Sequence, residues 1–333
     1  MSELRVTETP IPGLLLVDLP VHRDSRGWFK ENWQRAKMID LGLPDFGPVQ
    51  NNISFNNAIG ATRGIHAAPW DKLVSVASGR IFGAWVDLRE GDSFGATFST
   101  EVDPCVAVFV PRGVGNAYQT LESDTVYTYL VNDHWSAGAT YTNLNVADET
   151  LAIAWPISLT DVELSDNDLA HPRLAEVVAM APRRTLILGA GGQLGRALVA
   201  AVPDADAWTR DEFDITDSAA YDRVSWRDYD VVINAAAYTS VDAAETTQGR
   251  RDAWRVNVKA MVNLAKVATA YGLTLVHVSS DYVFDGEEPE HGVDEGYSPL
   301  GVYGQTKAAG DAVVSTVPRH HICLFYTSDA ADD

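Results

Sequence analysis

Hydrophobic residues in the first half of the chain fall into short runs separated by turn-forming residues. The runs are four to eight residues long and rich in Val, Phe, Trp and Tyr, with glycine, proline and aspartate between them. Short apolar runs at this spacing are typical of an all-β sandwich or barrel. The predicted strands are Leu14–Val17, Leu73–Ala77, Ile81–Leu88, Val106–Val110 and Val126–Val131.

The pattern changes after about Asp168. Residues 171–183 contain two prolines and no strand-like alternation, so they are predicted to be a linker between an all-β domain (1–170) and a second domain (184–322). From Thr185 onward strands alternate with helices, which predicts a Rossmann-like parallel, doubly wound α/β sheet. The predicted elements there are strands Thr185–Leu188, Val231–Asn234 and Leu273–Val278 and helices Gly192–Ala201, Asp252–Tyr271 and Gly304–Thr316.

Composition narrows the classes of function. A length of 333 residues fits two domains of roughly 100–200 residues each. The net charge of −21 and the lack of a basic run argue against a nucleic-acid partner. No apolar stretch approaches the roughly 20 residues of a membrane span, and the first ten residues lack a signal-peptide core. Two cysteines, neither in a metal-ligand motif, fit a reducing compartment. We therefore expect a soluble cytoplasmic protein without a metal site.

A glycine-rich turn opens the second domain. Gly189–Gly195 follows a predicted strand and begins a predicted helix, so its free amides can bind a pyrophosphate. The alternative is a glycine-rich turn without a ligand. The next strand end, Ala207–Arg210, carries no carboxylate for a ribose hydroxyl. Arg210 can instead pair with the 2′-phosphate of NADP, which favours NADPH over NADH, although a surface arginine is the alternative.

A tyrosine and a lysine share one face of the last predicted helix. Tyr303 and Lys307 are spaced i and i+4, and a nearby ammonium lowers a phenol's pKa toward that of a useful general acid for carbonyl reduction. Ser280 follows the strand Leu273–Val278, at the sheet end where ligands bind in α/β folds. A chance pair on a helix surface is the alternative.

Together these motifs resemble the dTDP-4-dehydrorhamnose reductases of the extended short-chain dehydrogenase/reductase family. The resemblance covers about Thr185 to His320 and rests on GxxGQLG, NAAAYTxVDxAE from Asn234, SxDYVFDG from Ser279 and YGxxK from Tyr303. It implies that Tyr303 protonates the C4 oxygen, Lys307 holds the nicotinamide ribose and Ser280 hydrogen-bonds the substrate. The implied cofactor contacts are Gly189, Gly192, Gln193, Leu194, Gly195, Arg210, Asp214, Ile215, Ala235, Ala236, Ala237, Tyr303 and Lys307.

The first domain combines a histidine, a lysine and a tyrosine. His66 in Arg63-Gly-Ile-His66, Lys72 and Tyr129 supply a base, a cation and an acid, the groups needed to move a proton beside a ketone. The alternative for an isolated histidine is a structural role.

This half resembles dTDP-4-dehydrorhamnose 3,5-epimerase, a cupin-like jelly roll that usually dimerises. The matching stretches are Asp24–Phe29 with Glu31, Val49–Asn52, Arg63–His66, Lys72, Val86–Arg89 and Leu164–Asp166. The resemblance implies that His66 is the base, Asp166 its orienting partner, Tyr129 the acid and Lys72 the enolate stabiliser. The implied substrate contacts are Arg26, Phe29, Glu31, Gln50, Asn52, Arg63 and Asn116.

Three departures from these families affect the prediction. Ala67–Asp71 is shorter than the family's equivalent, and Asn116 replaces a histidine, so single epimerisation at C3 or C5 stays open beside double epimerisation. The reductase resemblance stops before the family's C-terminal lobe, so a truncated reading frame with a non-native tail over 323–333 is expected.

The predicted function is two steps of dTDP-L-rhamnose synthesis. The first is epimerisation of dTDP-4-dehydro-6-deoxy-D-glucose, and the second is NADPH-dependent reduction at C4, in a homodimer joined through the cupin-like domain. Two alternatives stay open: a non-catalytic NADP-binding protein, and an enzyme for another 6-deoxy nucleotide sugar.

Overall fold

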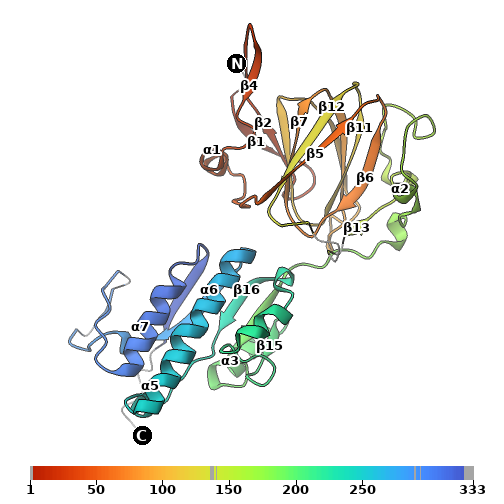
Figure 1. Ribbon diagram of the computed structural model, residues 1–333. Helices are drawn as coiled ribbons and strands as arrows, with labels where there is room; N and C mark the ends of the chain where they lie inside the picture. The colour runs from red at the N-terminus through yellow and green to blue at the C-terminus, as the bar shows by residue number, and fades with distance from the viewer. Residues whose placement is uncertain (1–2, 136–138, 140, 289, 293, 326–333) are drawn as a thin grey trace. The chain divides into compact units, whose positions relative to one another are not determined.

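The apolar runs of the first half pair into two antiparallel sheets (Figure 1). The computed structural model describes residues 3–135, 139, 141–288, 290–292 and 294–325. Its two compact units divide at Pro182 and Arg183. In the first unit one sheet has the order β1-β2-β10-β7-β12-β5 and the other β13-β6-β11-β8-β9. The jelly-roll prediction is confirmed.

Apolar side chains from both sheets meet between them. Val74, Trp85 and Val108 belong to this buried cluster. The strands of the first sheet are β1 (Arg5–Glu8), β2 (Leu15–Asp18), β10 (Val106–Val110), β7 (Lys72–Ser78), β12 (Thr125–Val131) and β5 (Gln50–Asn56). Those of the second are β13 (Thr142–Asn143), β6 (Thr62–Ala67), β11 (Val114–Thr120), β8 (Ile81–Asp87) and β9 (Thr97–Val102).

Smaller elements flank these sheets. The strands β3 (Val21–Asp24) and β4 (Gly27–Lys30) form a hairpin, and α1 (Arg35–Asp40) follows it. The helix α2 (Asp166–Ala170) begins at Ser165, whose side chain accepts a hydrogen bond from the amide of Asp168.

The predicted linker is packed onto the first unit. Leu174, in the short 3₁₀ helix Leu174–Glu176, contacts a buried cluster that includes Ile65 and Leu88, and Met180 pairs with Arg89. The first compact unit therefore extends to Pro182, beyond the predicted domain boundary at residue 170, because these apolar side chains pack against it.

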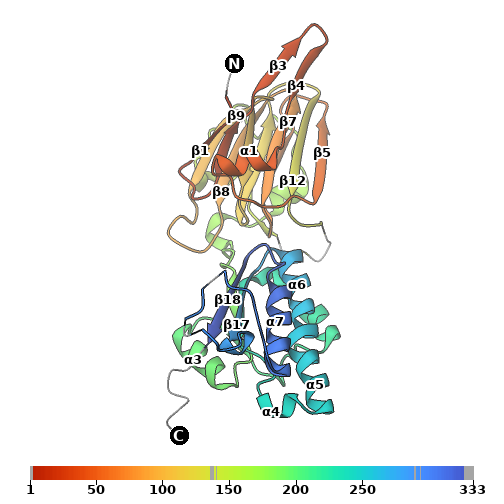
Figure 2. The same ribbon diagram turned by 90° about the vertical axis from the view of Figure 1, so that its left-hand side faces the viewer.

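The second unit is a five-stranded parallel sheet of order β15-β14-β16-β17-β18. The chain starts at β14, moves to the edge strand β15, then returns to the other side of β14. Crossovers in opposite directions place α3 on one face and α6 and α7 on the other, as Figure 2 shows. The strands are β14 (Arg184–Leu188), β15 (Asp206–Trp208), β16 (Tyr229–Asn234), β17 (Thr274–Ser280) and β18 (His320–Phe325). The Rossmann-like prediction is confirmed.

One predicted helix of this unit is divided. The segment predicted as a single helix over Asp252–Tyr271 forms α5 (Thr247–Trp254), a π-helical turn (Arg255–Lys259) and α6 (Ala260–Tyr271). The other helices are α3 (Gln193–Ala201), α4 (Val241–Ala244) and α7 (Val302–Val314), with 3₁₀ turns at Ser218–Arg223, Trp226–Asp228 and Asp281–Val283.

The sheet extends into the predicted non-native tail. Cys323 lies in β18 and pairs with Val278, so residues 323–325 continue the sheet, and the non-native origin of residues 323–333 stays a prediction. Residues 326–333 lie outside the described residues. Among the described helices, none is both long and apolar enough to cross a membrane.

Candidate active sites

A cavity of about 880 Å³ opens in the first unit. Strands of both sheets and the segment leading into α2 line it. Of the predicted residues, Arg63, His66, Lys72, Asn116 and Tyr129 all line this cavity.

His66 is held by a carboxylate two residues from the predicted one. Its Nε2 lies 2.7 Å from Oδ1 of Asp168, whereas Asp166 is exposed. Because Ser165 caps α2 through the amide of Asp168, the buried Asp168 is the residue turned toward β6. The assignment of Asp166 is therefore corrected to Asp168. The motif Ser-Asp-Asn-Asp offers two carboxylates, and the helix start decides between them.

The pKa of Asp168 shows that its surroundings stabilise the ionised carboxylate. Burial alone would raise that pKa, but hydrogen bonds from His66, Ser165 and the Gly64 amide, with the charge of His66, outweigh burial and lower it. Gly64 has a φ of 123°, and a Cβ there would lie 2.5 Å from Cβ of Ala117. Only glycine fits this position of β6, two residues before His66.

Lys72 is a buried cation facing the same cavity. Burial lowers its pKa to about 8. Its Nζ donates a hydrogen bond of 2.8 Å to Oδ1 of Asn116, whose Nδ2 donates to the Tyr127 hydroxyl over 3.1 Å. Asn116, which replaces the expected histidine, thus orients the ammonium.

Two tyrosines of β12 reach the cavity. Burial raises the pKa of both Tyr127 and Tyr129, so both phenols carry their protons at neutral pH. Tyr127 accepts a hydrogen bond from Asn116 and stacks on Tyr118 with ring centroids 4.2 Å apart. Tyr129 has the Lys72 ammonium 6.0 Å from its ring centroid. Tyr129 is therefore the tyrosine of the two whose hydroxyl is more available to a ligand.

Five predicted substrate contacts lie away from this cavity. Arg26 pairs with Asp24 on the β3–β4 hairpin, Phe29 is 66% exposed and Glu31 pairs with Lys37. Gln50 and Asn52 hydrogen-bond each other over 2.8 Å on β5. The residues that line the cavity in this chain include none of these five.

The sequence analysis missed His171. This residue caps the end of α2, and its Nε2 lies 3.8 Å from Oδ1 of Asp168. Its ring meets that of His66 edge to face, with centroids 5.6 Å apart. Burial and the charge of His66 lower the pKa of His171, with Asp168 opposing. Its place next to Pro172 suggested a linker.

In the second unit the glycine turn joins β14 to α3. A Cβ on Gly195 would lie 2.1 Å from the carbonyl oxygen of Gly189, so only glycine allows this approach. Gly192 caps α3 without a side-chain hydrogen bond, which leaves the first helical amides available. These features fit a pyrophosphate at the helix start.

Three other predicted cofactor residues have local partners. Nε of Arg210 lies 3.5 Å from Oδ2 of Asp214, and the arginine side chain is 75% exposed. Oδ1 of Asp214 also accepts hydrogen bonds from the amide and hydroxyl of Thr216, each 2.8 Å. The amide of Ala236 donates to Oδ1 of Asn234 over 3.2 Å, at the end of β16. Arg210 therefore remains available to an anionic ligand, whereas Asp214 shapes its own turn.

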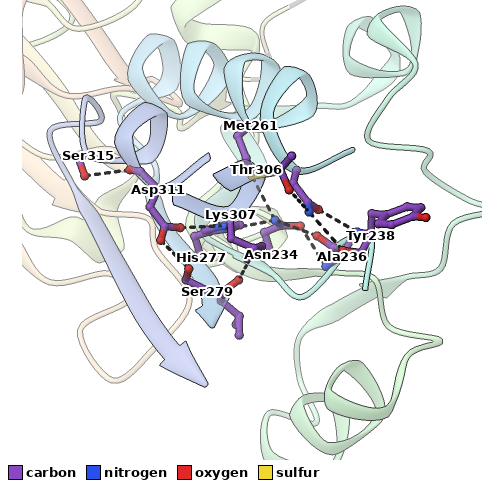
Figure 3. Close-up of polar contacts among 12 residues, drawn as sticks. Asn234, Ala236, Tyr238, Met261, His277, Ser279, Thr306, Lys307, Asp311 and Ser315 are labelled. Carbon is purple, nitrogen blue, oxygen red and sulfur yellow. Dashed lines mark hydrogen bonds and ion pairs between the residues drawn. The ribbon is translucent and has the colours of Figure 1, made fainter. Parts of the chain in front are cut away.

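Lys307 points into the interior of the unit (Figure 3). Its Nζ donates a hydrogen bond of 2.7 Å to the carbonyl oxygen of Val278 and lies 3.2 Å from Nε2 of His277. Burial lowers its pKa to about 8, with Asp311 opposing. Burial and the Lys307 charge lower the pKa of His277 to about 3, so that imidazole is neutral.

Asp311 completes this buried network. Its Oδ2 accepts a hydrogen bond of 2.5 Å from Ser279, and Oδ1 lies 3.5 Å from Nε2 of His277. Burial raises the pKa of Asp311, although hydrogen bonds from Ser279 and Tyr297 and the Lys307 charge lower it.

Tyr303 lies at a second cavity, of about 900 Å³. Burial raises its pKa, and a hydrogen bond with Ser280 only partly offsets this effect. Tyr303 and Ser280 therefore lie within hydrogen-bonding reach of each other, but Lys307 does not lower the pKa of Tyr303. Its ammonium is held by Val278 and His277 instead.

Comparison with known proteins identifies the first unit. Residues 8–176 match the family model of dTDP-4-dehydrorhamnose 3,5-epimerase. A protein of Streptococcus pyogenes serotype M6, named Protein RmlC homolog, is 47% identical over 180 residues, which are 52% of this chain and 90% of that one. The chain belongs to the dTDP-4-dehydrorhamnose 3,5-epimerase family.

A solved structure agrees with this assignment to the epimerase family. RmlC from Streptococcus suis in complex with dTDP-D-xylose is 45% identical, with a TM-score of 0.52, and the match covers 54% of this chain and 96% of that one. We call residues 1–182 the epimerase unit.

The second unit matches a different family over residues 183–325, described as the RmlD substrate binding domain. A dTDP-4-dehydrorhamnose reductase of Mycobacterium tuberculosis is 44% identical over 147 residues, which are 41% of this chain and 47% of that protein. The chain spans about half the length of the curated reductases it matches. We call residues 183–325 the reductase unit.

Proposed function

We propose that the epimerase unit removes and returns protons at the carbon atoms next to the C4 ketone of a dTDP-4-dehydro-6-deoxy sugar. The supporting observation is the His66–Asp168 pair, 2.7 Å apart, in a cavity that Lys72 and Tyr129 also line. The family of the unit points to this substrate class. Inversion at C3 and C5 follows if the proton returns to the opposite face.

The proton steps follow from the hydrogen bonds. Asp168 accepts the Nε2 proton of His66, so Nδ1 keeps the lone pair that removes the carbon-bound proton. The carboxylate also stabilises the imidazolium that forms. The enolate oxygen then carries negative charge, which the Lys72 ammonium stabilises in a site of low polarity. Tyr129, protonated at neutral pH, supplies the proton from the other side.

Deuterium exchange tests this proposal directly. The keto-sugar nucleotide is incubated with the full chain in deuterated water, and NMR follows deuterium at C3 and at C5 separately. Because general base catalysis contributes typically about 100- to 10,000-fold, His66→Asn is expected to slow exchange by that factor. Exchange at one carbon alone would restrict the proton transfer to that carbon. Unchanged exchange in His66→Asn would refute the assignment.

We propose that the reductase unit binds NADPH, and that a protein with the full length of its reductase relatives reduces the C4 ketone. The residues fit the cofactor, since the uncapped start of α3 accepts a pyrophosphate and Arg210 can meet a 2′-phosphate. Bound NADPH would supply the hydride. Tyr303 would give its proton to the C4 oxygen, while Ser280 orients the phenol.

Cofactor binding and turnover are measured separately. NADPH fluorescence is titrated with the full chain and with Arg210→Ala, and NADH is the matched control ligand. Arg210→Ala is expected to weaken NADPH about tenfold and leave NADH unchanged, because one charge-assisted contact is lost. Binding without NADPH oxidation would support the second candidate, a non-catalytic NADP-binding unit, for this chain.

We also propose a homodimer through the epimerase unit. Ile53 and Phe55 are 69% and 56% exposed on the edge strand β5, next to which a second copy would remove apolar surface from water. Arg26, Phe29 and Glu31 would contact substrate only in the cavity of another copy. Light scattering of the full chain and of Phe55→Asp tests this, with a monomeric wild type as the contradicting result.

A further inference from the structure

Three potential metal ligands meet at one wall of the epimerase cavity. His66, Asp168 and His171 each offer one ligand atom, and these atoms lie within 4.8 Å of one another. Nε2 of His66 and Nε2 of His171 lie 2.7 Å and 3.8 Å from Oδ1 of Asp168. The His66–Asp168 pair is part of the proposed epimerase chemistry, whereas His171 has no part in it.

The spacing suits a small divalent cation. Zinc binds histidine nitrogen and carboxylate oxygen at about 2.0–2.2 Å, so tetrahedral ligand atoms lie roughly 3.3 Å apart. The distance from Oδ1 of Asp168 to Nε2 of His66 is shorter than 3.3 Å, and the distance to Nε2 of His171 is longer. A movement of each imidazole ring by roughly half an ångström would bring both distances to the tetrahedral value. The cavity supplies room for a fourth ligand.

The ligand types define the class of metal. Two imidazoles and one carboxylate favour late first-row cations such as Zn²⁺, Co²⁺ and Ni²⁺, whereas Mg²⁺ and Ca²⁺ prefer sets of oxygen atoms. The carboxylate is firmly placed, since the Asp168 side chain is 7% exposed and its backbone amide is fixed by Ser165. Both histidine side chains are more exposed, at 40% and 20%, so both rings can adjust.

We propose that His66, Asp168 and His171 form a site for Zn²⁺ or a related late first-row cation, and that the bound metal inhibits proton exchange. The inhibitory part rests on the proposed epimerase function; the binding part does not. A metal on Nε2 of His66 replaces the proton that Asp168 now accepts. The neutral imidazole then carries its proton on Nδ1, which leaves no lone pair to remove a proton from carbon. The His66 imidazole therefore cannot bind the metal and act as the base at the same time.

Zinc titration of the metal-free full chain tests the site. Calorimetry with ZnCl₂ is expected to give one ion per chain, and MgCl₂ is expected to give no heat at this site. His171→Ala removes one ligand and keeps the His66–Asp168 pair, so its zinc affinity is expected to fall at least tenfold. His22→Ala, on the exposed β3–β4 hairpin, is the matched control and is expected to bind like wild type. Equal affinity in wild type and His171→Ala, or no one-to-one binding, would overturn the site.

A second measurement separates the site from the epimerase function. Deuterium exchange is followed with one equivalent of zinc and again after EDTA. Exchange is expected to stop with zinc, to return with EDTA, and to resist zinc at the same concentration in His171→Asn, whose folding is checked by circular dichroism. Zinc binding with undiminished exchange would overturn the inhibition. A chain that binds zinc but never exchanges deuterium would contradict the epimerase proposal and uphold the site.

Discussion

Each unit buries one lysine beside its proposed site, and the two lysines are held in different ways. Burial lowers the pKa of both Lys72 and Lys307 to about 8. Lys72 faces a cavity and has a neutral partner, Asn116. Lys307 faces the interior, where Val278 and His277 hold it near the carboxylate of Asp311.

From this difference we infer that Lys72 serves a ligand, whereas Lys307 stabilises the fold. An ammonium whose partner is neutral gains most when an anionic oxygen arrives, so a buried lysine of this kind is suited to stabilise an enolate. An ammonium near a buried carboxylate already has its counter-charge. We therefore expect substitution of Lys72 to reduce chemistry, and disruption of the Lys307 network to reduce stability.

Among the tests of the two lysines, Lys72→Met is expected to have the largest effect, a loss of deuterium exchange. Methionine fills a similar volume but cannot stabilise the enolate, and loss of one such donor costs about 100- to 1,000-fold in rate. Because a buried charge is removed, the unfolding free energy of the epimerase unit should not fall. Deuterium exchange and urea unfolding measure the two quantities. A destabilised variant with normal exchange would contradict the comparison.

Asp311→Asn should instead lower the unfolding free energy of the reductase unit and leave deuterium exchange by the epimerase unit unchanged. Removing one partner of a buried charged pair costs about 3 kcal/mol, so the amides of α7 should exchange faster with solvent. Asp252→Asn is the matched control, since Asp252 forms a partly exposed ion pair with Arg255 and such pairs contribute at most about 1 kcal/mol. Equal losses in the two variants would show that the buried network has no special weight.

The pH dependence gives a smaller effect of the same origin. Since the pKa of Lys72 is about 8, exchange by wild type should fall about fivefold from pH 8 to pH 9 as the ammonium is lost. The folded-state pKa lies below the 10.5 of free lysine, so the unfolded chain binds more protons between these values. The contribution of Lys72 to stability therefore rises with pH in this window. A fall in exchange that accompanied unfolding would contradict this cause.

The sequence predicted the apolar strands better than the polar ones. The strands β8 and β10 are runs of apolar residues, and their predicted bounds agree with the structure to within one residue. The strands β5 (QNNISFN) and β6 (TRGIHA) were missed because polar residues interrupt them. These two strands present alternate side chains to the cavity or to solvent, which weakens their apolar pattern. The strands β7 and β12, which carry Lys72 and Tyr129, were predicted from their apolar runs.

The site residues divide in a similar way. Motifs predicted that His66, Lys72 and Tyr129 share a site, although only Lys72 and Tyr129 stand on or beside a strand that the apolar pattern predicted. The choice of Asp168 over Asp166 depends on where Ser165 starts a five-residue helix, and the approach of His171 depends on how that helix ends. Spacing along the chain contains neither fact. The inward direction of the Lys307 side chain likewise depends on Asp311 and His277. No sequence motif indicated that these two residues lie next to Lys307.

The Asp168→Asn and Asp166→Asn pair tests the central claim most directly. The two residues lie on the same helix, and only the buried Asp168 contacts His66. Asparagine at 168 can donate to Nε2 and so favours the tautomer with its proton on Nδ1, where the base must act. Deuterium exchange should fall at least 100-fold in Asp168→Asn and stay within twofold of wild type in Asp166→Asn. Loss of exchange in Asp166→Asn, with Asp168→Asn unaffected, would contradict the account.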